Sequence, residues 1–173
     1  MANIYLISDT HFGHANALKF LRADGVTPMR SFSCVEEMDQ RMIDNWNRVV
    51  KPSDHVYHLG DVALKRQDVD RVMPQLHGHL RLVRGNHDIF KTALYARYFD
   101  EIYGVRVLDD IIFSHIPVHP LSIKERWHGN CHGHLHEKDE YPGRYLNVAV
   151  ERINYTPIAL EDVKKLLGAR KLA

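Results

Sequence analysis

The sequence has little of several features that mark specialised classes of protein. It has two cysteines among 173 residues, which do not make a disulfide framework or a CxxC zinc site and agree with a reducing compartment. No apolar run approaches the roughly 20 residues that span a bilayer, and the chain opens into a predicted strand rather than a signal peptide. We therefore expect a cytoplasmic protein that does not enter the membrane.

An excess of charge of one sign is also lacking. The chain has 23 Lys and Arg residues and 22 Asp and Glu residues, so its formal net charge is +1. Duplex nucleic acid is bound through many phosphate contacts at once, and this balance offers no broad attraction for it. The hydrophobic (45%) and charged (26%) fractions are those of an ordinary globular domain, and no repeat or linker interrupts the chain. We expect a single domain over residues 1–173.

The residue type that stands out is histidine, with 13 copies, and five of these lie in short polar clusters. Each cluster follows a stretch predicted to be a β-strand, and the carboxyl ends of parallel strands meet at one edge of a sheet. A single such cluster could equally be a helix cap, a turn or a hydrogen-bonded strand end. Together they indicate one shared metal site, and in chain order they are Asp9-Thr10-His11, Gly60-Asp61, Gly85-Asn86-His87-Asp88, Ser114-His115 and Gly133-His134-Leu135-His136.

Up to about residue 100 the hydrophobic pattern predicts strands that alternate with helices. This rhythm is typical of parallel strands joined by helical crossovers. The longest predicted helix has Ser33 as its N-cap and acidic residues in its first turn. The predicted strands cover residues 4–7, 55–59 and 80–84, and the predicted helices cover residues 15–21, 33–50 and 68–76.

The pattern changes after residue 100. Residues 101–108 and 111–114 predict two strands that flank Asp109-Asp110, as in a hairpin. Residues 144–150 predict a further strand, and residues 160–167 predict a last helix. We therefore expect an antiparallel half after the parallel one.

The order and the residue types of the five clusters resemble the calcineurin-like metallophosphoesterase superfamily. The pattern of that superfamily is Asp-x-His, Gly-Asp, Gly-Asn-His-(Asp/Glu), a lone His and Gly-His-x-His, and every ligand position is filled here. The resemblance runs from about residue 4 to about residue 150 and is strongest to the small, cap-less bacterial and phage-like members. It implies an α+β fold of the metallo-dependent phosphatase type, a four-layer α/β/β/α sandwich with two facing mixed β-sheets.

The resemblance also implies a set of metal ligands. Asp9, His11 and His136 would hold one divalent ion, Asn86, His115 and His134 would hold a second, and Asp61 would bridge the two. Carboxylate, imidazole and amide oxygen together suit borderline ions, whereas an all-oxygen set would favour Mg²⁺ or Ca²⁺. We expect two divalent ions, with Mn²⁺ first and Fe, Zn, Ni and Co as alternatives.

The implied activity is hydrolysis of phosphate esters by a hydroxide that bridges two metals. No segment is long enough to form a separate cap, so we expect an open cleft with few walls. We expect a phosphodiesterase that acts on small diesters or nucleotides. A phosphomonoesterase of the same fold is one alternative, and a non-catalytic metal-binding scaffold is an alternative of a different class. Relatives that became scaffolds have lost ligand residues, whereas this sequence keeps all seven.

His87 is expected outside the metal shell as a catalytic residue. In Gly-Asn-His-Asp the Asn faces metal, and the next residue can reach the phosphate or the leaving oxygen as a general acid. Asp88 is expected to orient His87 and to hold its proton. Gly60 and Gly85 are expected where any side chain would crowd the metals.

Three further polar residues allow two interpretations. His14 is close enough in the chain to Asp9 and His11 to face the phosphate, and it could instead cap the short helix that follows. Arg22 and Arg30 could reach the rim of the cleft and meet a phosphate, although a solvated loop is the simpler expectation.

Other histidines are expected to be structural or exposed. His77 and His79 fall in a connection before a predicted strand, which indicates a surface turn. His55 and His58 are three positions apart on one strand, so they point to opposite faces and cannot chelate one ion. A separate zinc site at Cys131 is not expected, because no second cysteine is nearby.

Overall fold

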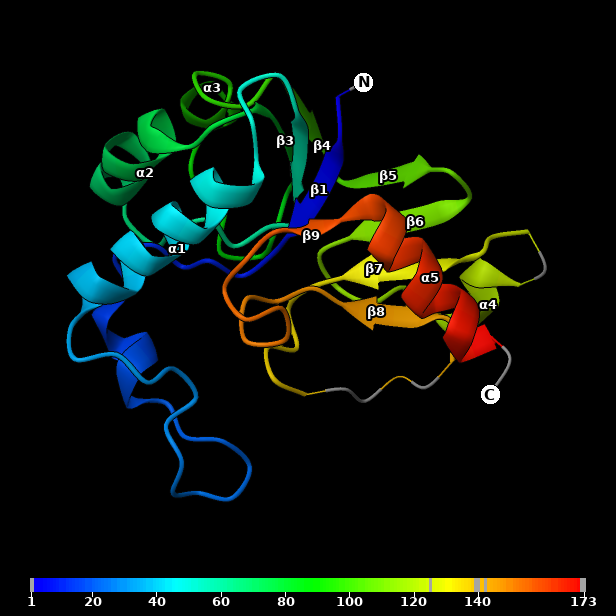
Figure 1. The fold of residues 1–173 in the computed structure, drawn as a ribbon, viewed down its shortest axis with the longest axis horizontal. Coiled ribbons are helices and arrows are strands. Elements are labelled where there is room, and N and C mark those ends of the chain that lie inside the picture. Colours follow the sequence, from blue (N-terminus) through cyan, green and yellow to red (C-terminus); the bar gives the residue numbers. More distant parts are fainter. Residues whose placement is uncertain (1, 125, 139–140, 142, 172–173) are drawn as a thin grey trace.

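The computed structural model describes residues 2–124, 126–138, 141 and 143–171 (Figure 1). Its first sheet consists of β1 (Ile4–Ile7), β2 (His55–His58), β3 (His79–Val83), β4 (Glu101–Tyr103) and β9 (Ile158–Ala159). The strand order is β4-β3-β2-β1-β9. β1 to β3 run parallel, as the sequence predicted, and β9 runs antiparallel to β1. β4 also runs parallel to β3, although residues 101–108 were expected in the antiparallel half.

The second sheet consists of β5 (Val105–Leu108), β6 (Ile111–Ser114), β7 (Gly129–His132) and β8 (Tyr145–Asn147), in that order. β5 and β6 form the predicted hairpin, and Asp109 and Asp110 both have a positive φ (48° and 60°), as in a tight two-residue turn. The expected antiparallel half is otherwise wrong, because β6 pairs with β7 and β7 with β8 in parallel. The connections, residues 115–128 and 133–144, are long enough to cross back over the sheet.

The sequence indicated one strand over residues 101–108, but the structure has two strands there. The chain leaves β4 at Tyr103 and enters β5 at Val105, and Gly104 between them carries it from the first sheet to the second. Because β4 and β5 are edge strands of their sheets, this single residue joins the two sheets at one side.

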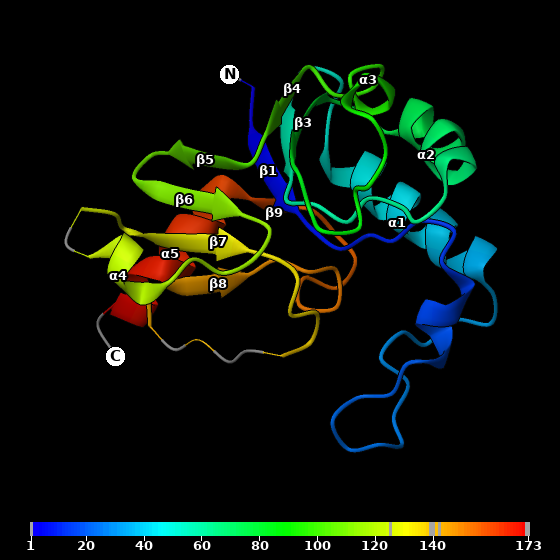
Figure 2. The same cartoon turned by 180° about the vertical axis from the view of Figure 1, so that it is seen from behind.

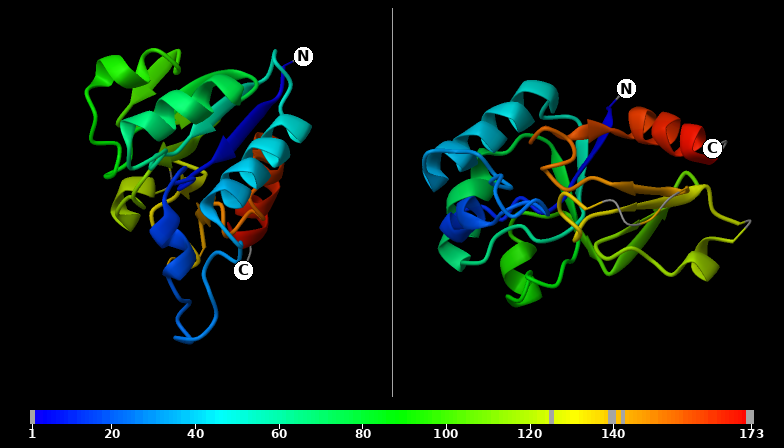
Figure 3. Two further views of the ribbon diagram at one scale, coloured as in Figure 1. Left: turned by 90° about the vertical axis from the view of Figure 1, so that its left-hand side faces the viewer. Right: turned by 90° about the horizontal axis from the view of Figure 1, so that it is seen from below.

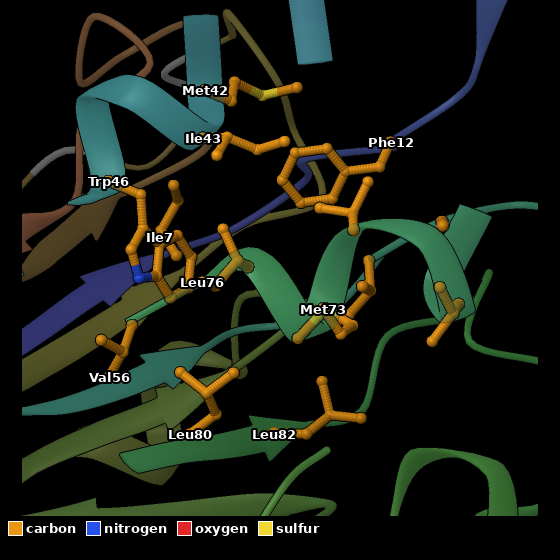
Figure 4. Close-up of a cluster of buried hydrophobic side chains, with 14 of the residues drawn as sticks. Ile7, Phe12, Met42, Ile43, Trp46, Val56, Met73, Leu76, Leu80 and Leu82 are labelled. Carbon is orange, nitrogen blue, oxygen red and sulfur yellow. The ribbon is translucent and has the colours of Figure 1, made fainter. Parts of the chain in front are cut away.

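Helices α1 (Val35–Val49), α2 (Arg66–Val72) and the short α3 (Thr92–Tyr95) cover the outer face of the first sheet (Figures 1 and 2). α1 buries Met42 and Trp46 in a cluster with Ile7 of β1 and Val56 of β2 (Figure 4). Burial of each such side chain contributes about 1.5–3 kcal/mol. This apolar layer fixes the position of the strands that lead to the polar clusters.

The next residues along the same strands face the second sheet. Leu6 of β1 and Tyr57 of β2 pack in one cluster with Phe113 of β6 and Cys131 of β7. This alternation of side chains between two faces is the expected period of a strand. Helix α5 (Leu160–Lys171) contacts β8, β9 and β1, so it closes the edge where the two sheets meet (Figure 3).

The outer face of the second sheet is covered by α4 (Pro120–Ile123) and the chain around it. Ile112 and Tyr145 of the sheet pack there against Ile123. The predicted α+β fold with two facing mixed sheets and helices outside is therefore confirmed. Among the described residues, no helix combines the length and the apolar character needed to cross a bilayer.

The N-terminus of α1 differs from the prediction by one residue. Its N-cap is Cys34, which makes no side-chain capping hydrogen bond. Ser33 lies one position earlier, and both its backbone N–H (2.8 Å) and its Oγ (2.5 Å) donate to Glu37 Oε2. The carboxylate of the first turn therefore ties down the loop that precedes the helix.

Candidate metal centre

All five polar clusters lie at the carboxyl ends of strands, and these strands come from both sheets. Asp9, Asp61 and Asn86 follow β1, β2 and β3 of the first sheet. His115 follows β6, and His134 follows β7 of the second sheet. The prediction that every cluster follows a strand is confirmed. Parallel strands end at the same edge, so the clusters meet in one place.

The backbone at these strand ends has a conformation that residues other than glycine rarely adopt. Five of the seven expected ligands have a positive φ: Asp9 (58°), His11 (47°), Asp61 (59°), His134 (69°) and His136 (51°). Each left-handed residue costs on the order of 1 kcal/mol, and such residues gather at functional sites where the surrounding structure holds them. The sharp bend at each ligand is what turns its side chain into the site.

Two glycines let the ligand loops approach one another. A Cβ on Gly60, whose φ is +96°, would lie 2.6 Å from the Cα of Gly85. A Cβ on Gly85 would lie 2.3 Å from Asp61 Oδ1. A side chain at either glycine would therefore crowd the loops that carry the expected ligands.

Asp9 is the centre of the first group of ligands. Its side chain is fully buried, its Oδ1 has no hydrogen-bond partner, and the Nε2 atoms of His11 and His136 each lie 3.9 Å from that oxygen. These distances are too long for hydrogen bonds. Two atoms that share one ion at about 2.1 Å can lie up to about 4.2 Å apart. A buried, unpartnered carboxylate oxygen is costly without a cation, so these residues fit the implied metal.

The second group of ligands surrounds His115. Its Nδ1 lies 2.8 Å from the carbonyl oxygen of Leu59, which can only accept, so this nitrogen carries the proton. Its Nε2 faces Asn86 Oδ1 (2.8 Å) and Asp61 Oδ2 (3.3 Å), which are acceptors too. Burial opposes a charge on the ring, but the contact with Asp61 raises the pKa of His115. Acceptors that converge in this way need a positive charge between them, either a proton on Nε2 or a metal ion. The donor set again fits a bound metal.

Asp61 and Asn86 complete the arrangement. Asp61 Oδ2 lies 3.6 Å from His11 Nε2, so one carboxylate oxygen faces both groups. Asn86 Oδ1 lies 2.9 Å from His134 Nδ1. All seven expected ligands are therefore brought together. The combinations Asp9-His11-His136 and Asp9-Asp61-His115 each have ligand atoms within 4.8 Å of one another, close enough to hold an ion.

Two of the expected ligands, His11 and Asp61, are held in the forms that bind cations. Burial, with the Arg30 guanidinium, lowers the pKa of His11 to about 2, so its ring stays neutral. Burial opposes the charge of Asp61, but its contacts with His115 and with the backbone N–H of His87 hold its pKa at about 2. A neutral imidazole and an ionised carboxylate are the metal-binding states.

Comparison with known proteins agrees with this geometry. The family described as calcineurin-like phosphoesterase matches residues 2–168. The chain belongs to the calcineurin-like phosphoesterase family. It is 35% identical over 181 residues to Uncharacterized protein MJ1445 of Methanocaldococcus jannaschii, across 99% of this chain and 95% of that protein. Its fold is similar to the crystal structure of the protein of unknown function AQ665 from Aquifex aeolicus, with a TM-score of 0.76, 31% identity, and coverage of 96% of this chain and 100% of that one.

In this calcineurin-like phosphoesterase a buried ion pair supports the first group of ligands. Glu151 Oε1 lies 3.2 Å from His136 Nδ1 and accepts a hydrogen bond from Arg30 Nε at 2.6 Å. Because Nδ1 of His136 faces a carboxylate, its Nε2 presents a lone pair toward Asp9. Arg30 also donates to the carbonyl oxygens of Asp9 (2.6 Å) and Thr10 (2.8 Å).

The position of Arg30 corrects both interpretations drawn from the sequence. Its side chain is fully buried, so it lies neither at the rim of the cleft nor in a solvated loop. A buried guanidinium requires a carboxylate and several acceptors, and Glu151 with two strand-end carbonyls supplies them. The sequence analysis missed Glu151, because a lone acidic residue far along the chain belongs to no local pattern. Arg22 is half exposed and is paired with Glu137 at 3.4 Å.

Asp88 was expected to orient His87, but the structure gives it a different role. Its buried carboxylate accepts three backbone N–H groups, from Asp61 (2.9 Å), Val62 (3.0 Å) and Gly85 (2.8 Å). The His87 side chain lies on the exposed side of the same loop. The physical reason is that buried backbone donors at the strand ends need an acceptor. Asp88 therefore ties the loop after β3 to the loop after β2, and this fixes the position of Asp61.

His87 and His14 stand beside His11 on the open side of the centre. The ring centroid of His11 lies 5.5 Å from that of His87 and 5.7 Å from that of His14. His14 is the N-cap residue of the 3₁₀ helix η1 (Ala15–Lys19), but its side chain makes no capping hydrogen bond to that helix. Both rings adjoin a predicted ligand without belonging to either group, which is where contacts to a substrate are expected.

His58 and His55 point to opposite faces of β2, as predicted. His58 is buried: its Nδ1 accepts the N–H of Gly60 at 3.2 Å, and its Nε2 lies 2.9 Å from Thr10 Oγ1. Burial lowers the pKa of His58 to about 3, so the ring is neutral and structural. The ring of His55 packs instead beside that of the exposed His79, with centroids 5.3 Å apart.

Proposed function

We propose that this chain is a dinuclear metal-dependent phosphoesterase and that its substrates are small phosphodiesters, nucleotides included. The supporting observation is the position of Asp61, whose Oδ2 faces His11 Nε2 at 3.6 Å and His115 Nε2 at 3.3 Å. One carboxylate oxygen between two groups of ligands is the arrangement that lets two ions share a site. We propose Mn²⁺ as the working metal and the cytoplasm as the location.

The ligands divide between two ions. Asp9, His11 and His136 would hold one, Asn86, His115 and His134 would hold the other, and Asp61 would contact both. When bound, such ions make water acidic enough to attack phosphorus near neutral pH and offset the charge that builds up on the phosphate. Glu151 keeps the ring of His136 in the orientation and tautomer that a ligand needs.

His87 is proposed to act on the substrate itself. Its side chain is exposed, its ring lies 5.5 Å from that of His11, and its backbone N–H donates to Asp61 Oδ1 at 2.8 Å. An imidazole in this position can give a proton to the oxygen of the departing alcohol. His14 on the same side can donate a hydrogen bond to a phosphate oxygen.

The pairing of Arg22 and Arg30 favours a diester over a monoester. Arg30 is buried in its pair with Glu151, and Arg22 is paired with Glu137. The dianion of a monoester gains most from a free guanidinium that binds two oxygens at once, whereas a diester carries a single charge. Phosphomonoesterase activity is the alternative within the same reaction class.

A non-catalytic metal-binding scaffold is the alternative of a different class. A scaffold needs no exposed proton donor beside the metals. This chain places the exposed ring of His87 there and keeps all seven ligand positions, which supports an enzyme.

The test is hydrolysis of bis(p-nitrophenyl) phosphate and of p-nitrophenyl phosphate after the protein has been stripped by a chelator and reloaded with single divalent metals. We expect no turnover in chelator, recovery with Mn²⁺, and a higher kcat/KM for the diester. Full turnover in metal-free protein would contradict the role of the metals. A higher kcat/KM for the monoester would reverse the substrate assignment, and no turnover with any metal would favour the scaffold.

The variant Asp61→Asn tests the bridge separately. Because one carboxylate serves both groups, we expect elemental analysis to find a loss of both ions together. Two ions per chain in this variant would contradict the bridging role.

A further inference from the structure

We infer that a hollow beside the metal centre receives a flat aromatic group of the substrate, of about the size of a nucleobase. This inference rests on the proposed function and names the class of ester that the site prefers. The hollow has a volume of about 650 Å³, which is within the range of small-molecule sites. It adjoins the metal centre through His134 and His136, and its apolar lining consists of Phe20, Leu21, Met29 and Leu135.

A line of rings leads from the metal centre into the hollow. The centroids of His11 and His14 lie 5.7 Å apart, and those of His14 and Phe20 lie 5.8 Å apart with their planes at 77°. Aromatic rings attract one another in such edge-to-face arrangements at about 4.5–7 Å. Phe20 is 48% exposed, so part of its ring is free to contact a further ring. An aromatic group attached to a phosphate at the metals would extend this line.

The apolar wall of the hollow is held in place by hydrogen bonds. The N–H of Met29 donates to the carbonyl oxygen of Phe20 at 2.8 Å, which closes the base of the loop. Glu137, next to the ligand His136, accepts a hydrogen bond from the N–H of Ala23 at 3.1 Å. The wall is therefore formed before a ligand arrives, so little ordering entropy opposes binding.

The chemistry of the wall favours a ring with polar edges over an alkyl chain. Phe20 and Leu21, which is 51% exposed, offer apolar surface, whereas Lys138 lines the same hollow with a positive charge and Arg22 is paired there with Glu137. Cations bind both π-faces and the electronegative atoms on the edge of a heterocycle. A nucleobase offers both features, and an alkyl group offers neither.

This hollow also corrects the expectation of an open cleft with few walls. The loop of residues 20–33 projects from the body of the molecule (Figures 1 and 3) and forms a wall beside the Gly-His-x-His loop. Selectivity needs walls that reject the wrong group. We therefore expect discrimination between ester groups.

A smaller hollow on the other side of the centre supplies a matched control. It has a volume of about 370 Å³ and is lined by Asn86 and His115 together with Val105, Ile116 and Pro117. Ile116 is 54% exposed, close to the 48% of Phe20. Truncating Ile116 removes exposed apolar surface near the metals and leaves the hollow at Phe20 intact.

The experiment uses p-nitrophenyl diesters that share one leaving group and differ in the second ester, which is methyl, cyclohexylmethyl, benzyl or thymidine 5′. Ratios of kcat/KM are measured for the Mn²⁺-loaded wild-type protein, Phe20→Ala and Ile116→Ala. Intrinsic reactivities of the esters cancel when the ratios are compared between proteins. We expect the benzyl and thymidine esters to exceed the methyl ester by on the order of tenfold. The preference should vanish in Phe20→Ala and persist in Ile116→Ala.

Three outcomes would overturn the inference. Equal kcat/KM for the cyclohexylmethyl and benzyl esters would show that the hollow does not select a ring. A preference that survives Phe20→Ala, or one that falls equally in Ile116→Ala, would place the aromatic group elsewhere. Phe20 is half exposed, so its truncation leaves the core intact, and thermal unfolding of the variant verifies this.

A binding measurement separates this inference from the proposed function. Calorimetric titration of the Mn²⁺-loaded protein with benzylphosphonate and methylphosphonate requires no turnover. If no ester is hydrolysed but benzylphosphonate binds on the order of tenfold more tightly, and only when Phe20 is present, the hollow stands and the catalytic proposal fails. Equal affinities for the two phosphonates would overturn the inference even if hydrolysis is observed.

Discussion

Arg30 and Glu151 lie 121 positions apart in the chain and form a buried ion pair, with Arg30 Nε 2.6 Å from Glu151 Oε1. The pair touches the first group of ligands from two sides, because Glu151 contacts the ring of His136 and Arg30 holds the carbonyl oxygen of Asp9. Burial opposes the charge of Glu151, but its hydrogen bond with His136 and the Arg30 guanidinium hold its pKa at about 2. Glu151 is therefore ionised at neutral pH.

We predict that Glu151→Gln weakens metal binding without unfolding the protein. The amide has nearly the same shape, but it no longer supplies the charge that makes His136 a stronger ligand. We expect the affinity of one of the two sites to fall roughly 10–100-fold. Calorimetric titration with Mn²⁺ measures this, with the exposed Glu161→Gln on α5 as the control. An unchanged affinity would mean that the ion pair only ties the loop down.

Asp88→Asn is predicted to weaken the fold and metal binding together. An amide keeps one acceptor oxygen, but its NH₂ group replaces the second oxygen of the Asp88 carboxylate. This NH₂ group cannot accept the backbone N–H groups that the replaced oxygen accepts. Each buried donor left without a partner costs about 1–3 kcal/mol. Urea unfolding and elemental analysis measure the two effects, with the exposed Asp100→Asn as the control. If metal content stayed normal and only kcat fell, Asp88 would act through His87. Its role in tying the loop after β3 to the loop after β2 would then be contradicted.

His87→Ala is predicted to keep both metals and to lose turnover. If the ring protonates the departing alcohol, kcat should fall by about 10²–10⁴ on an alkyl ester. The loss should be smaller on a p-nitrophenyl ester, because p-nitrophenolate leaves without a proton. His79→Ala, whose side chain is 55% exposed, is the control. Equal losses on both esters would exclude the acid role and leave stabilisation of charge.

The stability of the metal-free protein should fall in acid because of His58. Its pKa is about 3 in the folded state, where burial excludes the charge, and about 6.5 in an unfolded chain. Below about pH 6.5, His58 therefore binds a proton in the unfolded state but not in the folded state. Stability is lost as the pH falls from about 6.5 toward 3.

At pH 5 this single group lowers the free energy of unfolding by roughly 2 kcal/mol relative to pH 7. Urea unfolding in chelator at the two pH values measures the loss, and His58→Gln should lose less than the wild-type protein. The exposed His79→Gln serves as the control. Equal losses in the His58→Gln variant and the wild-type protein would show that His58 can be protonated in place.

The ligand loops were predictable because strand ends carry a local signal. An apolar run followed by a polar pair marks the end of a buried strand whatever the partner strands are, and Asp9, Asp61 and Asn86 all follow such runs. Parallel pairing of β1 to β3 was predictable as well, since helical patterns between the strands leave crossovers as the connections.

Apart from the hairpin of β5 and β6, pairing in the second sheet carried no such signal. The segments between β6 and β7 and between β7 and β8 lack a helical pattern long enough to indicate a crossover, yet both pairs are parallel. The chain passes from β4 to β5 at one residue, Gly104. The alternation of side chains on either side of Gly104 is the same as in one continuous strand, so the sequence did not show the break. The direction of these strands depends on their contacts with the first sheet. Those contacts join residues that are far apart in the sequence, so a short stretch of sequence does not show them.

Which residues can bind a metal is a property of their side chains and of the motifs that contain them, so the seven candidate ligands were visible in the chain. Which groups support those ligands depends on burial. Arg30 and Glu151 are single charged residues without a local pattern. Asp88 lies in the Gly-Asn-His-Asp motif, but the motif does not show that its carboxylate accepts backbone N–H groups. A buried charge must be paired and a buried N–H must be accepted, and the partners become neighbours only when the two sheets close. The supporting contacts of the centre, and the wall at Phe20, therefore belong to the tertiary structure alone.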